Sequence, residues 1–157
     1  MAHYLFDQLA FVRGNTLKAM DGITEEEAER IPDGFRNHIR WNLGHIYVVL
    51  ERFAFHYIGL PLQLPEGFKA LFEYGTTPLT PPEGITPPTL PELEALLRGQ
   101  LQRIQDALGD RMHEEIVPPY KTSTGITLGS PEQFLSFNLY HEGMHQSIIK
   151  QYKKMIR

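Results

Sequence analysis

Residues 130–155, SPEQFLSFNLYHEGMHQSIIKQYKKM, decide the fold because they carry a complete set of helix signals. Ser130 is a good N-cap residue, Pro131 suits the first helical position, and Gln133 follows at the third. The pattern predicts one long helix that continues to about Met155. Seven residues are predicted to share its inward face: Phe134, Phe137, Asn138, His141, His145, Ile148 and Tyr152.

Three other stretches have the same helical periodicity. They cover residues 2–19, residues 37–57 with a start at Asn37 or Trp41, and residues 89–108, which open with a capping box from Thr89. The apolar stripes of the first and third are Leu5, Phe6, Leu9, Val12 and Thr16, and Leu93, Leu97, Leu101, Ile104 and Leu108. Four long amphipathic helices predict an all-α protein, a four-helix bundle, in one domain of residues 1–157.

The connection between the second and third helices is rich in proline, with eight prolines from Pro61 to Pro91. We interpret it as a long, rigid crossover rather than a domain linker, because neither flank alone could form a full core. A short helix is expected within it, around residues 65–72. Another is expected after Thr24, and residues 124–129 are expected to form a turn or a short hairpin. The sequence alone does not settle the topology.

Composition excludes several classes of protein. The net charge is −4, and the one basic cluster, near residues 150–157, suits a helix end better than a nucleic-acid surface. The chain has no cysteine, so disulfides, thiolate metal sites and a cysteine nucleophile are excluded. We expect no signal peptide, because the first residues carry Asp7 and lack a basic stretch, and there is no stretch of about 18 apolar residues. We therefore expect a cytoplasmic protein that binds neither nucleic acid nor membrane.

Three histidines on inward helix faces form the main chemical signal. His141 and His145 are four residues apart, so both imidazoles lie on one face of the helix, one turn apart, where they can bind one ion. His45 lies on the inward face of the second helix, between Trp41 and Val49. Each could instead be a hydrogen-bonded core histidine. Three together match a catalytic zinc arrangement with an open coordination position.

The other four histidines are assigned surface or structural roles. His3 lies at the start of the first helix and His38 at the start of the second, while His56 lies at the far end of that helix and His113 in a polar link.

Residues 141–145, HEGMH, also match the H-E-x-x-H signature of zinc proteases. We do not favour that reading, because the short tail after His145 supplies no further histidine or carboxylate ligand. Glu142 is then either a base or a group that supports the ligands, or an exposed glutamate without a role.

Two more polar residues share the inward faces. Arg52 lies two turns beyond His45 and could hold an anionic substrate or pair with an interior carboxylate. Asn138 lies about one turn before His141 and could orient a water or a ligand. Structural hydrogen bonding is the alternative for both.

Two motifs make the chain resemble the DinB/YfiT-like superfamily. They are WNLGHI, residues 41–46, and TLGSPEQFLSFNLYHEGMHQ, residues 127–146, and the order of elements matches over essentially the whole chain. Many members follow the last histidine with Arg-Gly-Gln, whereas this chain has Gln146, Ser147 and Ile148. The three predicted ligand positions are unaffected by that difference.

The resemblance implies an up-down-down-up four-helix bundle, which suits the long crossover. It also implies a divalent metal site, carried here by His45, His141 and His145, with zinc or nickel as the expected ion. Members are often homodimers. Some transfer low-molecular-weight thiols, such as bacillithiol or mycothiol, to electrophiles.

Three functions stay open at this stage. The first is a metal-dependent enzyme that activates water or a low-molecular-weight thiol toward a small-molecule substrate, as a hydrolase or a thiol S-transferase. The second is a non-catalytic metal-binding or stress-response module. The third is a bundle that binds protein partners and holds no metal. The chain has no thiol of its own, so a transferase would need an external one.

Overall fold

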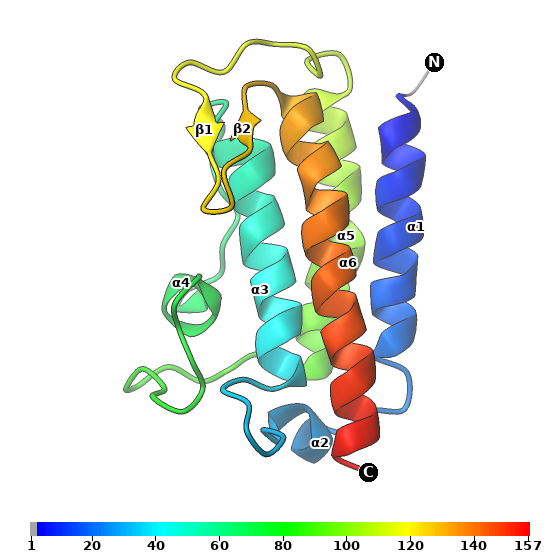
Figure 1. Cartoon of the computed structure of the whole chain (residues 1–157), viewed down its shortest axis with the longest axis vertical. Coiled ribbons are helices and arrows are strands. Elements are labelled where there is room, and N and C mark those ends of the chain that lie inside the picture. The colour runs from blue at the N-terminus through cyan, green and yellow to red at the C-terminus, as the bar shows by residue number, and fades with distance from the viewer. Residues whose placement is uncertain (1–2) are drawn as a thin grey trace.

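A computed structural model describes residues 3–157 and shows a mostly helical chain. Four long helices lie side by side: α1 Tyr4–Ala19, α3 Ile39–Glu51, α5 Leu90–Leu108 and α6 Pro131–Met155 (Figure 1). The shorter elements are α2 Glu25–Glu29, η1 Arg52–His56, α4 Phe68–Phe72, β1 Tyr120–Lys121 and β2 Thr127–Leu128. The expected all-α class is confirmed, with one small hairpin added.

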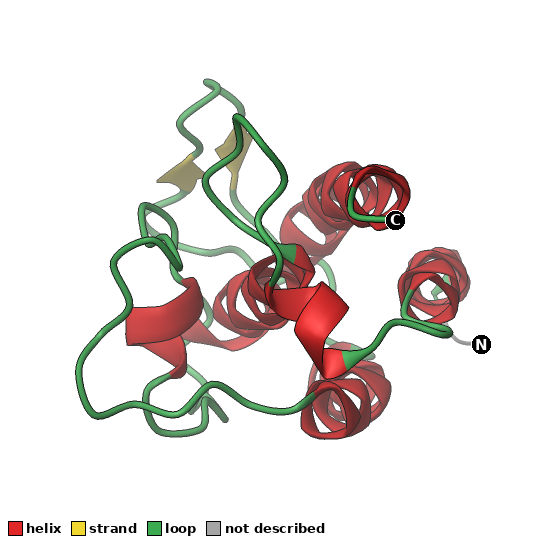
Figure 2. Ribbon diagram, turned by 90° about the horizontal axis from the view of Figure 1, so that it is seen from below, coloured by secondary structure: helices red, strands yellow, loops and turns green. Residues whose placement is uncertain are grey.

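The long helices surround a common interior. In Figure 1, α1 and α6 run downward and α3 and α5 run upward, and Figure 2 shows the same helices end-on. Helix α6 packs against both α1 and α3, and α5 packs against the same two from the other side. Among the described helices, none is both long and apolar enough to cross a membrane.

The helices begin where the sequence predicts, because side chains satisfy their free backbone N–H groups. Thr24 and Thr89 each form a complete capping box, and the Ser130 hydroxyl accepts from the Gln133 N–H. At α3 the cap is His38, whose ring accepts a hydrogen bond from the Trp41 N–H. Helix α3 then continues through the wider π-helical turn η1.

The short elements also match the expectations. Helix α4 lies in the proline-rich connection and packs on the outside of α3 (Figure 1). Strands β1 and β2 pair antiparallel, with Tyr120 opposite Leu128 and Lys121 opposite Thr127. The hairpin therefore includes the stretch that was expected to form a turn.

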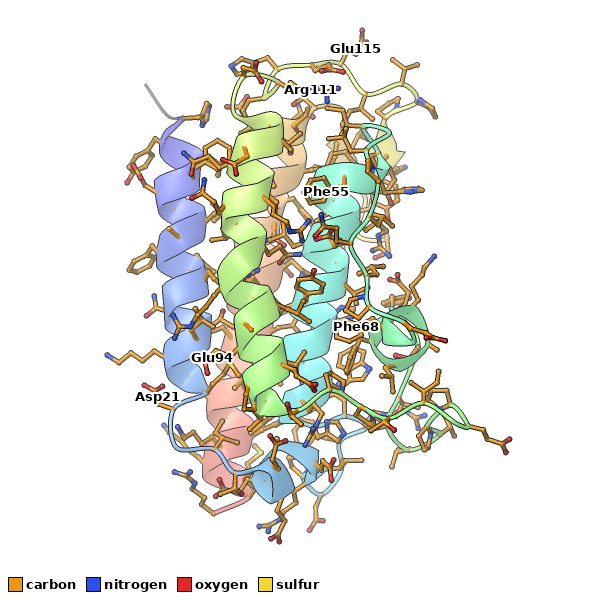
Figure 3. All side chains as sticks on the ribbon, turned by 180° about the vertical axis from the view of Figure 1, so that it is seen from behind. Asp21, Phe55, Phe68, Glu94, Arg111 and Glu115 are labelled. Atoms are coloured by element: carbon orange, nitrogen blue, oxygen red, sulfur yellow. The ribbon has the colours of Figure 1, made fainter. Side chains whose placement is uncertain are left out.

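A layer of buried polar residues separates two apolar clusters of the core. One cluster fills the lower end and includes Phe68, and the other fills the upper end and includes Phe55; both are labelled in Figure 3. Six residues between them are polar or charged yet at most 2% exposed: Arg13, Thr16, Glu51, Gln100, Asn138 and Glu142. A buried charge is costly unless it is paired, so this layer needs internal partners.

Three predicted stripes are corrected by this layer. Val12 is only partly buried while Arg13 is buried, and Leu101 is only partly buried while Gln100 is buried. On α6 the buried face is rotated, so that Glu142 is buried and His141 lies at the edge of the interior. The reason is that a buried polar residue with a partner can take a core position that periodicity assigns to an apolar neighbour.

Candidate metal centre

The three predicted ligands meet inside the protein. His45 on α3 and His141 and His145 on α6 each offer a ring nitrogen, and these atoms all lie within 4.8 Å of one another. The Nε2 atoms of His45 and His141 are 3.3 Å apart. Residues that are 96 positions apart in the sequence are therefore joined in one cluster by the packing of α3 against α6.

The close approach of the α4 segment to α3 helps to place His45. An added Cβ at Gly44 would lie 2.5 Å from both Cδ atoms of the Phe72 ring, far inside ordinary contact distance. Glycine is therefore needed here for Phe72 to reach the helix. The Phe72 carbonyl then lies 2.7 Å from Nδ1 of His45.

Two of the imidazoles are oriented by acceptors on their far side. Nδ1 of His45 donates to the Phe72 carbonyl, and Nδ1 of His145 donates to Oδ1 of Asn42 at 2.8 Å. In a neutral ring this leaves the Nε2 lone pair free. Metal-binding histidines are commonly held in this way. Nδ1 of His141 is buried and has no partner among the described residues.

Burial keeps the three rings neutral at pH 7. His45 and His145 are 4% and 7% exposed, and desolvation is the main cause that lowers the pKa of each. The pKa of His145 falls to about 3, and that of His141 to about 2 with the neighbouring imidazoles adding to the effect. Three neutral imidazoles with converging ring nitrogens fit a divalent transition ion such as zinc, nickel, copper or iron.

Aromatic side chains line the site. The Trp41 ring stacks on His45 with centroids 4.5 Å apart and planes 13° apart, and its Nε1 donates to Oγ1 of Thr76. The Phe53 ring lies edge-on to His141, with centroids 6.3 Å apart. These rings limit water around the imidazoles, which strengthens electrostatic interactions within the site.

A scan against family models gives a match to the DinB superfamily over residues 8–149. The chain belongs to this superfamily. Among solved structures, it is similar to a conserved protein from Enterococcus faecalis, with a TM-score of 0.69 and 12% identity over 99% of this chain and 98% of that one. That likeness shows the shared fold. Among curated proteins, no sequence matches this chain.

In this DinB superfamily member, Arg52 lies beside the histidines. It pairs with a partly exposed carboxylate, whereas the expectations were an interior carboxylate or an anionic substrate. Its guanidinium binds Glu73, and both side chains are about a quarter exposed, at 26% and 23%. Both charges act on His45, Glu73 raising its pKa and Arg52 lowering it. The pair therefore lies near the histidine triad and also reaches solvent.

Glu142 and Asn138 belong to the buried polar layer. The expectation of an exposed glutamate is wrong, because Glu142 is 1% exposed. Its carboxylate accepts hydrogen bonds from Nε of Arg13 at 2.7 Å, from Oγ1 of Thr16 at 2.9 Å and from Nδ2 of Asn138 at 3.3 Å. These contacts join α6 to α1 directly behind the helix face that carries His141 and His145.

The layer continues across the interior to α5 and α3. Arg13 also donates to the Leu97 carbonyl and to Oε1 of Gln100, and the Gln100 amide donates to Oε2 of Glu51. Arg103 completes the chain with a 2.8 Å ion pair to Glu51. Thr16 and Asn138 lie on predicted inward faces and were the only signal in the sequence. Arg13, Gln100 and Glu142 lie beside the predicted stripes, so periodicity did not reveal that they would join this layer.

The DinB comparison assigns no role to the remaining histidines, and the structure places them outside the triad. His38 caps α3, and its pKa is lowered to about 4, mainly by burial and also by Arg40. His56 is exposed at the end of η1. His3 and His113 both lie against Glu132, and nothing in their sequence spacing indicates that these three residues meet.

Proposed function

We propose that this chain is a DinB-type protein that holds one divalent transition ion, zinc or nickel, between His45, His141 and His145. One observation supports the proposal most directly. Three neutral imidazoles from two helices converge, and acceptors on the far side of two of them turn their Nε2 lone pairs toward the common centre. We also propose that residues 1–157 form a single domain and that its four long helices have the up-down-down-up connection of the DinB superfamily.

The function that suits this site best is activation of a small nucleophile. A divalent ion held by three uncharged ligands keeps its full charge and lowers the pKa of a water or a low-molecular-weight thiol that reaches it. The residues of the chain keep the ligands uncharged, orient two of them through Asn42 and the Phe72 carbonyl, and exclude water with Trp41 and Phe53. We propose a small-molecule hydrolase or thiol S-transferase.

Substrate access is proposed from the edge where His141 and Arg52 lie. His141 is less buried than the other two ligands, and Arg52 is partly exposed beside it. In this proposal an anionic group of the substrate displaces the Glu73 carboxylate and binds the Arg52 guanidinium in its place. For Glu142 and Asn138 we propose a positioning role, because the Glu142 carboxylate already accepts from three side chains of the buried layer.

Metal analysis tests the proposal. The purified protein, after dialysis against a weak chelator, is expected to retain one tightly bound ion per chain, and the His45→Ala and His145→Ala variants are expected to lose it. His56→Ala serves as the control, because it removes an exposed histidine remote from the triad. If both the His45→Ala and the His145→Ala variants still retain one tightly bound ion per chain, the proposed ligands are wrong.

Activity assays then separate the functions. The metal-loaded protein is screened for hydrolysis and for transfer of bacillithiol, mycothiol or glutathione to an electrophile, with His145→Ala as the inactive control. Turnover that disappears in this variant supports an enzyme. Stoichiometric metal without turnover in either screen supports the non-catalytic module. Sedimentation velocity tests the homodimer that the resemblance implies.

A further inference from the structure

A second cluster of potential metal ligands lies at the end of the molecule where α1 and α6 begin. His3 caps the start of α1, His113 lies in the connection between α5 and β1, and Glu132 is in the first turn of α6. Figure 3 labels Arg111 and Glu115, which flank His113 in the sequence, at this end. His141 is about 14 Å further along the axis of α6. The cluster is therefore separate from the triad.

The side chains in this cluster already converge. One oxygen of Glu132 lies 3.0 Å from Nε2 of His3, and the other lies 3.1 Å from Nδ1 of His113. The three potential ligand atoms fall within 4.8 Å of one another. Two ligand atoms on one tetrahedral zinc ion, each about 2.0–2.1 Å from it, are about 3.3 Å apart. Small movements of the side chains would therefore allow all three to bind one ion.

The backbone holds two of these three segments, the connection after α5 and the start of α6, together without help from the imidazoles. The Glu132 N–H donates to the Met112 carbonyl at 2.9 Å, and the Ile116 N–H donates to the Gly129 carbonyl at 2.9 Å. The connection that carries His113 is thus attached to the start of α6 on both sides of that histidine. Such an arrangement reduces the entropy lost when the side chains are ordered around a ligand.

We propose that His3, His113 and Glu132 form a second site for a divalent transition ion, with zinc as the reference ion. Two imidazoles and one carboxylate are a donor set that zinc accepts, with water completing its coordination. The ion would link the start of α1, the connection after α5 and the start of α6. It would act on the stability of this end of the molecule and not on the chemistry at His45.

This site is expected to bind metal more weakly than the triad. His113 is largely exposed, with 76% of its side-chain surface accessible. In addition, Nδ1 of His3 accepts a hydrogen bond from the Leu5 N–H at 3.2 Å. A neutral ring that binds metal through Nε2 carries its proton on Nδ1, so metal binding must displace this cap. The two sites therefore differ in affinity, which makes them separable.

Titration of the metal-free full chain with Zn²⁺ alone, against a chromophoric competitor at pH 7.5, tests the proposal. The wild type is expected to bind two equivalents, one tight and one weaker. His113→Ala should weaken the second equivalent more than about tenfold, since loss of a group that merely supports a ligand costs about 10–100-fold. Glu132→Gln should have the same effect, and the matched control His56→Ala should have none. Unchanged zinc binding in His113→Ala would overturn the second site.

The same titration on His145→Ala separates the two proposals. Loss of the tight equivalent with retention of the weaker one supports both sites. A single equivalent that is lost in His145→Ala but kept in His113→Ala supports the triad alone and overturns the second site. A single equivalent that is lost in His113→Ala but kept in His145→Ala supports the second site and overturns the triad. Histidine ¹⁵N NMR provides an independent readout, because the His113 ring signals should shift only with the weaker equivalent.

Discussion

Replacement of Gly44 by alanine should destabilise the protein, although the same change normally stabilises a helix. Glycine to alanine in a helix interior contributes about 1 kcal/mol in favour of folding. At Gly44 the new Cβ would lie 2.5 Å from two carbons of the Phe72 ring, so the ring must move by about 1 Å to restore ordinary contact. Overpacking of this kind costs about 1–3 kcal/mol.

The displacement also affects the hydrogen bond behind the histidine triad. Phe72 supplies the carbonyl that accepts from Nδ1 of His45, and such a bond contributes about 1 kcal/mol. Together these effects predict a net loss of about 1–3 kcal/mol in Gly44→Ala. For a chain of this size the loss corresponds to a fall of about 3–9 °C in Tm. Zinc affinity at the triad should fall by about tenfold, because the support of one ligand is disturbed.

Chemical and thermal unfolding of the metal-free protein provide the assay, with Gly14→Ala in α1 and Gly99→Ala in α5 as controls. A Cβ at either control position meets no atom within 4 Å, so both variants should gain about 0.5–1 kcal/mol. Adding Phe72→Leu to Gly44→Ala should recover part of the loss. If Gly44→Ala is stabilised as the controls are and binds zinc as the wild type does, the argument from the Phe72 contact is refuted.

Three further predictions concern residues around the site. Asn42→Ala should weaken zinc binding at the triad about 10–100-fold in a competition titration, because it removes the acceptor of His145, and unchanged affinity would contradict that role. Arg13→Met should cost about 3–5 kcal/mol in urea unfolding, because Glu142 is left charged and buried, and a cost below about 1 kcal/mol would show that the pair is unimportant. The pKa of His38 is lowered to about 4, so the neutral ring is favoured in the folded state and its contribution is fully present above about pH 6.5. That contribution, roughly 3 kcal/mol, is lost as the pH falls from 6.5 to 4, and stability measured against pH should fall less steeply in His38→Asn; equal slopes would contradict the prediction.

Much of the helical architecture was predictable because its signals are local. The caps at Thr24, Thr89 and Ser130 act within one helical turn, and each marks the start of a helix as expected. A short helix around residues 65–72 and a turn or short hairpin at residues 124–129 were also expected, and the structure has α4 at Phe68–Phe72 and the β1–β2 hairpin there. Burial was predicted less well where Arg13 and Gln100 occupy core positions, since their stability depends on partners in other helices.

The candidate site was likewise predictable where its geometry is local and not where it depends on contacts between helices. The sequence by itself determined that His141 and His145 share one helix face, because a spacing of four residues fixes that geometry in any α-helix. It also made His45 a candidate, but only the packing of α3 on α6 decided that its ring meets the other two. Tertiary structure likewise chose Asn42 and the Phe72 carbonyl as supports. Periodicity states which way a residue faces, whereas the contact between two faces depends on how far each helix is shifted and rotated against the next.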